Sequence, residues 1–158
     1  MRIEESIVID RPSAEVFAYL AERRHDVDWM ASVVESAWLE DGVALSVGTR
    51  GRMSLKMFGK RTDTIDEVTE FVPGRRIAHR TLEGALRLNT ACLTATEGGG
   101  TRTTVIAEAD RLPGGKWGRL LEPLIARFMR RGFRSDLRRL KKILESDAAD
   151  IQPARRAG

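Results

Sequence analysis

The residues that could carry acid–base chemistry are few, and His79 and Asp66 are the two that we expect to face the same interior. A strand register counted from the turns makes them diagonal neighbours, about 7 Å apart between backbones. Burial would raise the pKa of the Asp66 carboxyl, whereas a nearby imidazolium would lower it, so such a pair is suited to proton transfer. The alternative interpretation is a satisfied polar pair within the core or at a wet rim.

The remaining reactive side chains predict no metal, cofactor or covalent chemistry. His25 lies among charges in RRHDVD and is expected to be solvated, and no His/Cys spacing is typical of zinc. Cys92 is the single cysteine, so an internal disulfide is excluded and an inert interior thiol is expected. The N-terminal residues lack a signal-peptide pattern, and we expect a cytoplasmic protein that is a monomer or homodimer.

Short extended segments must position these side chains. Residues 3–9 predict a first strand, Ser13 is expected to cap a short helix with Val16, Phe17 and Leu20 on one face, and a second short helix follows. Beyond it, turn signals at short intervals predict an antiparallel meander. Its strands are expected at 33–40, 49–58, 61–71, 76–83, 86–96 and 101–112, with a type II turn at Pro73 and Gly74.

The stretch LLEPLIARFMRRGFRSDLRRLKKILE, residues 120–145, predicts a long amphipathic helix. Its apolar face would hold Leu121, Leu124, Ile125, Phe128, Met129, Phe133, Leu137, Leu140 and Leu144, with arginines opposite. Pro123 predicts a kink or a ragged start. Residues 1–146 are expected to form one domain, and residues 147–158 a disordered tail.

These elements predict an α+β fold in which a seven-stranded curved sheet wraps around the C-terminal helix and leaves a pocket between them. The turns predict pairing of Phe58 with Arg61, Leu55 with Thr64, Met53 with Asp66, Val68 with His79, Asp66 with Thr81, Thr81 with Leu88, His79 with Thr90, and Ile77 with Cys92. One face then combines thioethers, aliphatic groups and hydroxyls. Such a lining suits an elongated apolar guest that carries a few oxygens.

Six features of the sequence match the pattern of one known superfamily, namely IDRPSAEVFAYLA at 9–21, Trp29, VGTRGR at 47–52, EVTEFVPGRRIAHR at 67–80, GGGTRTTV at 98–105 and the C-terminal helix. In these features the chain resembles the SRPBCC or START-like superfamily, in particular its small bacterial polyketide cyclase/dehydrase branch. It implies a helix-grip fold whose cavity binds lipids, sterols, polyketides or other apolar molecules. Some members are enzymes, so the resemblance also implies a cyclase, aromatase or dehydratase as an alternative, with His79 as base and Asp66 as its orienting or acidic partner.

The hydrophobic ligand is expected to meet side chains from the middle strands and from the helix. We predict contacts with Trp29, Met53, Leu55, Met57, Thr64, Thr81, Leu88, Thr90, Val105, Trp117, Leu121, Ile125, Phe128 and Met129. For Trp29 and Trp38, simple core packing is the alternative. Trp117 would either gate the entrance or anchor the start of the helix.

Charge is unevenly distributed along the chain. The net charge is +4, but residues 116–158 hold 12 basic and 5 acidic side chains, whereas residues 1–115 hold 15 basic and 18 acidic ones. The basic helix face, with Arg127, Arg130, Arg134 and Arg138, is either simply solvated or docks transiently on an anionic membrane or an acidic partner. No aromatic residue interleaves with these arginines, so a specific nucleic-acid partner is not expected.

Overall fold

The computed structural model describes residues 1–57, 59–109 and 115–146, which form one curved sheet and four helical segments. In chain order the elements are β1 (Arg2–Ile9), α1 (Ser13–Ala21), the 3-10 turn η1 (Arg23–His25), α2 (Asp26–Trp29), β2 (Val33–Trp38), β3 (Arg50–Met57), β4 (Lys60–Val72), β5 (Arg76–Glu83), β6 (Asn89–Glu97), β7 (Gly100–Glu108) and α3 (Gly115–Glu145).

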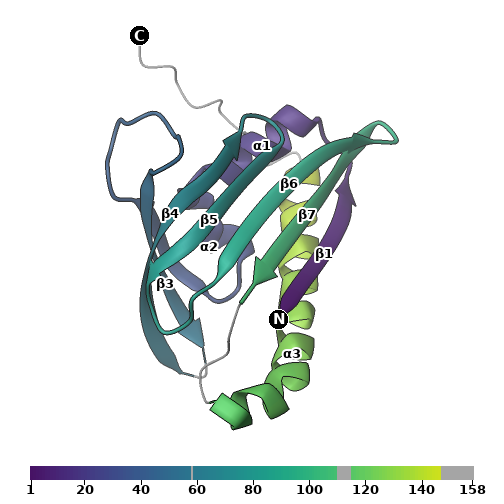
Figure 1. Cartoon of the computed structure of the whole chain (residues 1–158). Coiled ribbons are helices and arrows are strands. Elements are labelled where there is room, and N and C mark those ends of the chain that lie inside the picture. The colour runs from purple at the N-terminus through teal and green to yellow at the C-terminus, as the bar shows by residue number, and fades with distance from the viewer. Residues whose placement is uncertain (58, 110–114, 147–158) are drawn as a thin grey trace.

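The seven strands form an antiparallel sheet in the order β1-β7-β6-β5-β4-β3-β2. The meander from β2 to β7 accounts for six of them, and β1 joins at the β7 edge (Figure 1). Inward and outward residues alternate along β7, where Thr101, Thr103, Val105 and Ala107 are buried and their neighbours are more exposed. This alternation is the period of a sheet with one covered face, and it confirms the predicted helix-grip architecture.

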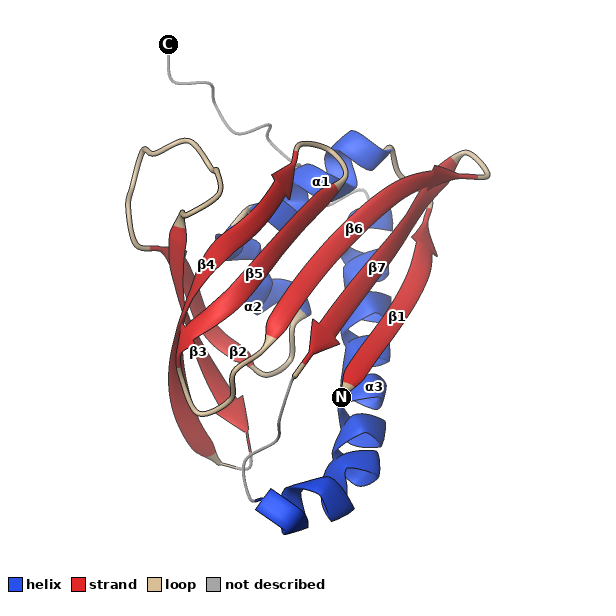
Figure 2. Cartoon of the chain, in the orientation of Figure 1, coloured by secondary structure: helices blue, strands red, loops and turns tan. Residues whose placement is uncertain are grey.

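The second half of α3 covers one part of the concave face. Leu137, Leu140 and Leu144 are 0–1% exposed and pack with residues of β1, α1, α2 and β7, including Ile9 and Trp29. Each such leucine contributes about 1.5–3 kcal/mol through burial. The first half of α3 extends past the end of the sheet, and its first turns run at an angle to the rest of the helix (Figure 2). Because the helix contains Pro123, a change of direction in this region has a local cause.

Several predicted boundaries need correction. Pro12, not Ser13, is the N-cap of α1, and Ser13 is the first helical residue. The last helix begins at Gly115 rather than residue 120, so Pro123 lies inside it. The strand expected from residue 86 begins at Asn89, because Gly84 has a φ of 147° and the connection before Leu88 is irregular. The tail at 147–158 lies outside the described residues.

The hairpin between β3 and β4 differs from the predicted register by two residues. Met57 pairs with Lys60, so Leu55 faces Thr62 and Met53 faces Thr64, where Thr64 and Asp66 were expected. The turn therefore centres one residue earlier, with the positive φ of 77° at Gly59 in its second position. Because the offset is an even number, every side chain stays on its predicted face.

Candidate ligand-binding face

The inward-facing side chains of β3 to β6 form the candidate site. The pairs Val68 with His79, Asp66 with Thr81, His79 with Thr90 and Ile77 with Cys92 are confirmed, and they place these residues on one face. Several predicted ligand residues on this face are only half-buried, namely Met53, Leu55, Thr64, Thr81, Leu88 and Thr90. Met57, at the hairpin end, is 42% exposed. Apolar surface therefore remains accessible on the concave side of the sheet.

A buried ion pair lies at one end of this face. Arg23 of η1 donates from its Nη2 to Asp66 of β4, and the two residues are 5% and 9% exposed. The guanidinium also lies 4.6 Å from the centre of the Trp38 ring. Gly51, which pairs with Asp66 across the strands, makes room for it, because a Cβ at that position would lie 2.6 Å from Nε of Arg23. The guanidinium thus lies against one glycine and one aromatic ring.

Three donor or acceptor atoms of this cluster have no hydrogen-bond partner among the residues that the structure describes. They are Nε and Nη1 of Arg23 and Nε2 of His79, all of which are buried. Buried polar groups in native proteins are nearly always hydrogen-bonded to protein, water or a ligand. Since a buried unsatisfied group costs about 1–3 kcal/mol, these atoms favour an additional hydrogen-bonding partner at this end of the face.

His79 stacks on the ring of Trp38, which also contacts Arg23. Its ring centre lies 6.1 Å from that of Trp38. Burial, with a smaller effect from the Arg23 charge, lowers the pKa of His79 to about 4, although Asp66 opposes this shift. The imidazole is therefore neutral at neutral pH. Asp66, the other residue of the predicted pair, has its carboxylate bonded to Arg23.

Asp26 of α2 is a further buried carboxyl beside this cluster. It is 7% exposed and accepts a hydrogen bond of 2.7 Å from the hydroxyl of Ser36. Burial raises the pKa of Asp26 to about 6, against the smaller lowering effects of Ser36 and Arg23. Burial also raises the pKa of the Cys92 thiol to about 12, which agrees with the expected inert thiol.

The predicted helix and core residues fall into two groups. Trp29 and Val105 are buried in the main core, at 4% and 8% exposure. On α3, Ile125 and Met129 are half-buried, whereas Trp117, Leu121 and Phe128 are 73%, 47% and 53% exposed. The helix residues thus lie on the part of α3 that the core leaves uncovered or half-covered, and the ligand contacts of both groups stay predictions.

Sequence reasoning did not identify Arg23, Asp26 or Ser36 as part of the site. In the sequence Arg23 follows Leu20 by three residues and Val16 by seven, which is helical spacing from buried residues of α1, although α1 itself ends at Ala21. Its neighbour Arg24 has 80% of its side chain exposed. Asp26 and Ser36 carry no comparable signal.

Other features of the described residues add no second site. An open groove of about 580 Å³ lies at the β4–β5 turn, lined by residues such as Ser13, Gly74 and Thr94, and none of the predicted ligand residues lines it. Within the described ranges no group of three or more His, Cys, Asp or Glu side chains could hold a metal ion. None of the helices described there is both long and apolar enough to cross a bilayer.

Comparison with solved structures gives the same fold at low sequence identity. The Zhui aromatase/cyclase from a Streptomyces species matches with a TM-score of 0.77 at 16% identity, over 98% of this chain and 99% of that one. A Thermus thermophilus protein matches with a TM-score of 0.76 at 20% identity, over 90% and 95% of the two chains. A START superfamily protein from Mycobacterium smegmatis gives 0.70 at 11% identity, over 89% and 97%.

Comparison with family models extends the likeness to the sequence. No match is found among curated proteins. The model described as "Polyketide cyclase / dehydrase and lipid transport" matches residues 1–145. Since this match spans nearly all of the chain that forms the sheet and the helix, the protein belongs to the polyketide cyclase/dehydrase and lipid transport family.

Proposed function

We propose that the protein binds and carries a hydrophobic small molecule on the concave face between the middle strands and the first half of α3. The observation that carries this proposal is the incomplete burial of inward-facing apolar side chains. Met53, Leu55 and Leu88 face the interior yet are half-buried, and Leu121 of α3 is 47% exposed. Covering such surface with an apolar guest is favourable by about 25 cal/mol per Å².

The ligand class follows from the unpartnered atoms at the end of this face. Nε and Nη1 of Arg23 are donors, and Nε2 of a neutral His79 donates or accepts depending on its tautomer. A guest with a carbonyl, hydroxyl or carboxylate oxygen near one end would satisfy these groups. We infer an apolar body with an oxygen-bearing terminus, which includes both fatty acids and polyketides.

A second candidate function is acid–base catalysis by His79, as in a polyketide cyclase or dehydratase. The free Nε2 of His79 and its neutral state at neutral pH favour a base in this position. Its pKa of about 4 argues for weak basicity, because a general base works best with a pKa near the operating pH. Asp66 is already engaged by Arg23. These observations favour binding over turnover as the principal role.

Binding is tested with Nile red, a neutral apolar dye, and by native mass spectrometry of the purified protein. Thr90 is half-buried on the inward face of β6, whereas Ala95 is exposed on the outer face of the same strand. We expect Thr90→Trp to weaken dye binding at least tenfold, because the indole would fill the guest's space, and Ala95→Trp to leave it unchanged. Equal dye binding by both variants, or no dye binding by the parent protein, would refute the proposal.

The catalytic candidate needs a separate test. If His79 is a base, His79→Ala removes turnover of a polyketone substrate while the circular dichroism spectrum and Nile red binding are retained. Turnover that is unchanged in this variant would exclude the role.

A further inference from the structure

The first half of α3 carries a patch of large apolar side chains that the fold leaves exposed. Trp117, Leu120 and Leu124 are 73%, 69% and 66% exposed, and Leu121 and Phe128 are 47% and 53% exposed. We call these five residues the apolar end. The same helix buries Leu137, Leu140 and Leu144 almost completely in its second half. A cluster of this kind on one helical segment marks an interaction surface rather than ordinary scattered exposure.

Cationic side chains flank the apolar end. Lys116, Arg127, Arg130 and Arg131 are exposed, and within the part of the chain that the structure describes none of these four forms an ion pair. Arg134, one turn further along, is different because its Nε contacts Glu5 at 2.8 Å. Glu122, the acidic residue of this segment, lies 3.4 Å from the N-terminal amine. The surface therefore presents uncompensated positive charge beside apolar side chains.

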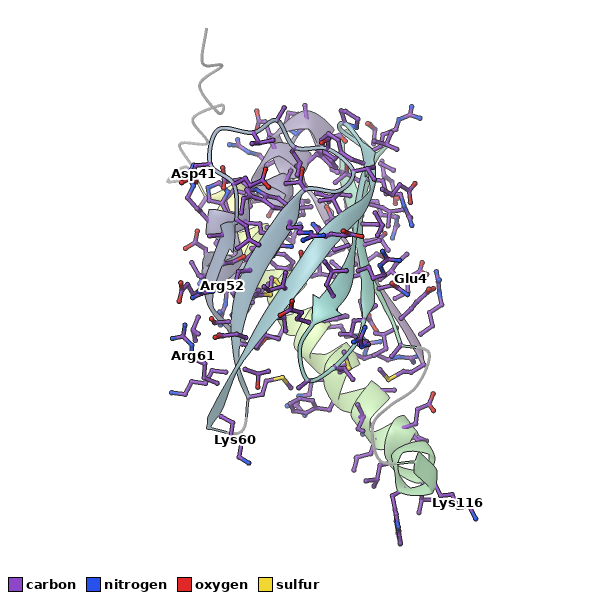
Figure 3. The ribbon with its side chains drawn as sticks, turned by 60° about the vertical axis from the view of Figure 1, so that its left-hand side comes forward. Glu4, Asp41, Arg52, Lys60, Arg61 and Lys116 are labelled. Atoms are coloured by element: carbon purple, nitrogen blue, oxygen red, sulfur yellow. The ribbon has the colours of Figure 1, made fainter. Side chains whose placement is uncertain are left out.

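The β3–β4 hairpin lies at the same end of the molecule as the start of α3. Figures 1 and 2 draw the hairpin and the helix start at the lower end of the molecule, and the turned view of Figure 3 shows Lys60 of the hairpin and Lys116 of the helix at this end but apart from each other. The hairpin adds exposed Lys56 and Lys60 near Met57, which is 42% exposed, whereas Arg61 of the hairpin is paired with Glu35 and Asp63. Two separate segments thus present the same combination of apolar and cationic groups.

We propose that this end of the protein docks on the surface of an anionic phospholipid bilayer. The apolar end would enter the boundary between headgroups and acyl chains, with Trp117 at the level that indole prefers. The flanking cations would contact lipid phosphates, and each cation would raise the affinity for an anionic surface about fivefold. This inference goes beyond ligand binding and does not require that the carried molecule be a lipid.

Charge distinguishes a bilayer from a second copy of the chain as the occupant. In a two-fold dimer the same surface meets itself, so the apolar end of one protomer would bring Arg127, Arg130 and Arg131 against their counterparts. Like charges placed opposite one another oppose such pairing. An anionic bilayer provides an apolar layer and negative charge together, and it therefore complements both features of the surface.

The test is flotation of the full-length protein with vesicles of phosphatidylcholine, alone or mixed with phosphatidylglycerol. We expect the protein to bind the anionic vesicles and its tryptophan emission to shift to the blue. This binding should be much weaker at about 1 M than at about 0.01 M salt. The variant Trp117→Ser/Leu124→Ser should lose at least about tenfold in affinity. Its matched control is Val47→Ser, which removes an apolar side chain that is 63% exposed elsewhere on the surface.

The charge requirement has its own pair of variants. Arg127→Glu/Arg130→Glu should abolish binding to anionic vesicles, whereas Arg75→Glu, at an exposed position near the β4–β5 turn, should not. Absence of binding by the parent protein, or equal binding by the apolar-end variant and its control, would overturn the proposal. So would a concentration-dependent dimer that Trp117→Ser/Leu124→Ser dissolves. Nile red binding that persists in Arg127→Glu/Arg130→Glu, which changes none of the predicted ligand contacts, separates loss of membrane docking from failure of the ligand-binding proposal.

Discussion

Asp26 offers the sharpest test of the buried polar cluster, because its burial makes folding stability depend on pH in a defined direction. Its pKa rises from 3.8 to about 6 in the folded protein. Between these values the folded state holds a proton that the unfolded state releases, so stability falls as pH rises. The difference corresponds to about 3 kcal/mol, at about 1.4 kcal/mol for each pH unit.

The substitution Asp26→Asn removes this dependence while keeping an oxygen that can accept the Ser36 hydroxyl. We expect the free energy of unfolding of the variant to match that of the parent near pH 4. Above about pH 6 the variant should be more stable by up to about 3 kcal/mol, because its amide never carries charge into the buried site. Urea unfolding followed by circular dichroism, repeated across this pH range, measures the difference.

Comparing variant with parent at each pH cancels the contributions of all other titrating groups. Asp41→Asn is the matched control, since it removes the same charge from an exposed position and should give little pH-dependent difference. A difference for Asp26→Asn that is constant across pH, or a variant that is less stable above about pH 6, would refute the assignment of a buried, protonatable carboxyl.

Three further predictions concern single contacts. His79 has its pKa lowered from 6.5 to about 4. Between these values the unfolded state takes up a proton that the folded state does not, so the parent loses stability as pH falls, and His79→Gln should gain about 3 kcal/mol relative to the parent between pH 6.5 and 4 in the same assay. Arg23→Met should lower the free energy of unfolding by about 3–5 kcal/mol, because it leaves the Asp66 charge buried without its partner. The double variant Arg23→Met/Asp66→Asn should recover part of this loss. If the two substitutions instead lower the stability additively, the coupling between the two residues is contradicted. Leu140→Ala should lower the free energy of unfolding by about 2–5 kcal/mol, whereas Leu124→Ala on the same helix should lower it by less than about 0.5 kcal/mol. Thermal denaturation measures both variants, and similar shifts for the two would show that the first half of α3 is packed.

The face of each strand was predictable from sequence, although the exact pairing was not. Alternation with a period of two places Met53, Leu55 and Asp66 on the interior whichever turn closes the hairpin. The offset of two residues between β3 and β4 depends on where the turn centres, and the glycine at position 59 is compatible with both choices.

The apolar face of the last helix was also predictable, but the sequence did not show which half of that face other elements cover. The pattern from Leu121 to Leu144 is continuous in the sequence, and it predicts one buried face. Among the described residues, the helix side chains that are fully buried with β1, α1 and α2 come from the second half, and the helix continues past these elements (Figure 2). Which half is covered follows from the lengths and positions of other elements, and local periodicity carries no information about them.

By itself the sequence determined the antiparallel meander, the amphipathic C-terminal helix and the inward position of His79 and Asp66, because turn residues and hydrophobic periods act over short distances along the chain. The tertiary structure decided which charges meet. Arg23 and Asp66 are 43 residues apart, and their ion pair forms because η1 packs beside β2 and the Arg23 side chain reaches Asp66 past Gly51, which leaves space for a guanidinium. Contacts of this kind depend on how separate elements pack, and no local pattern specifies that packing.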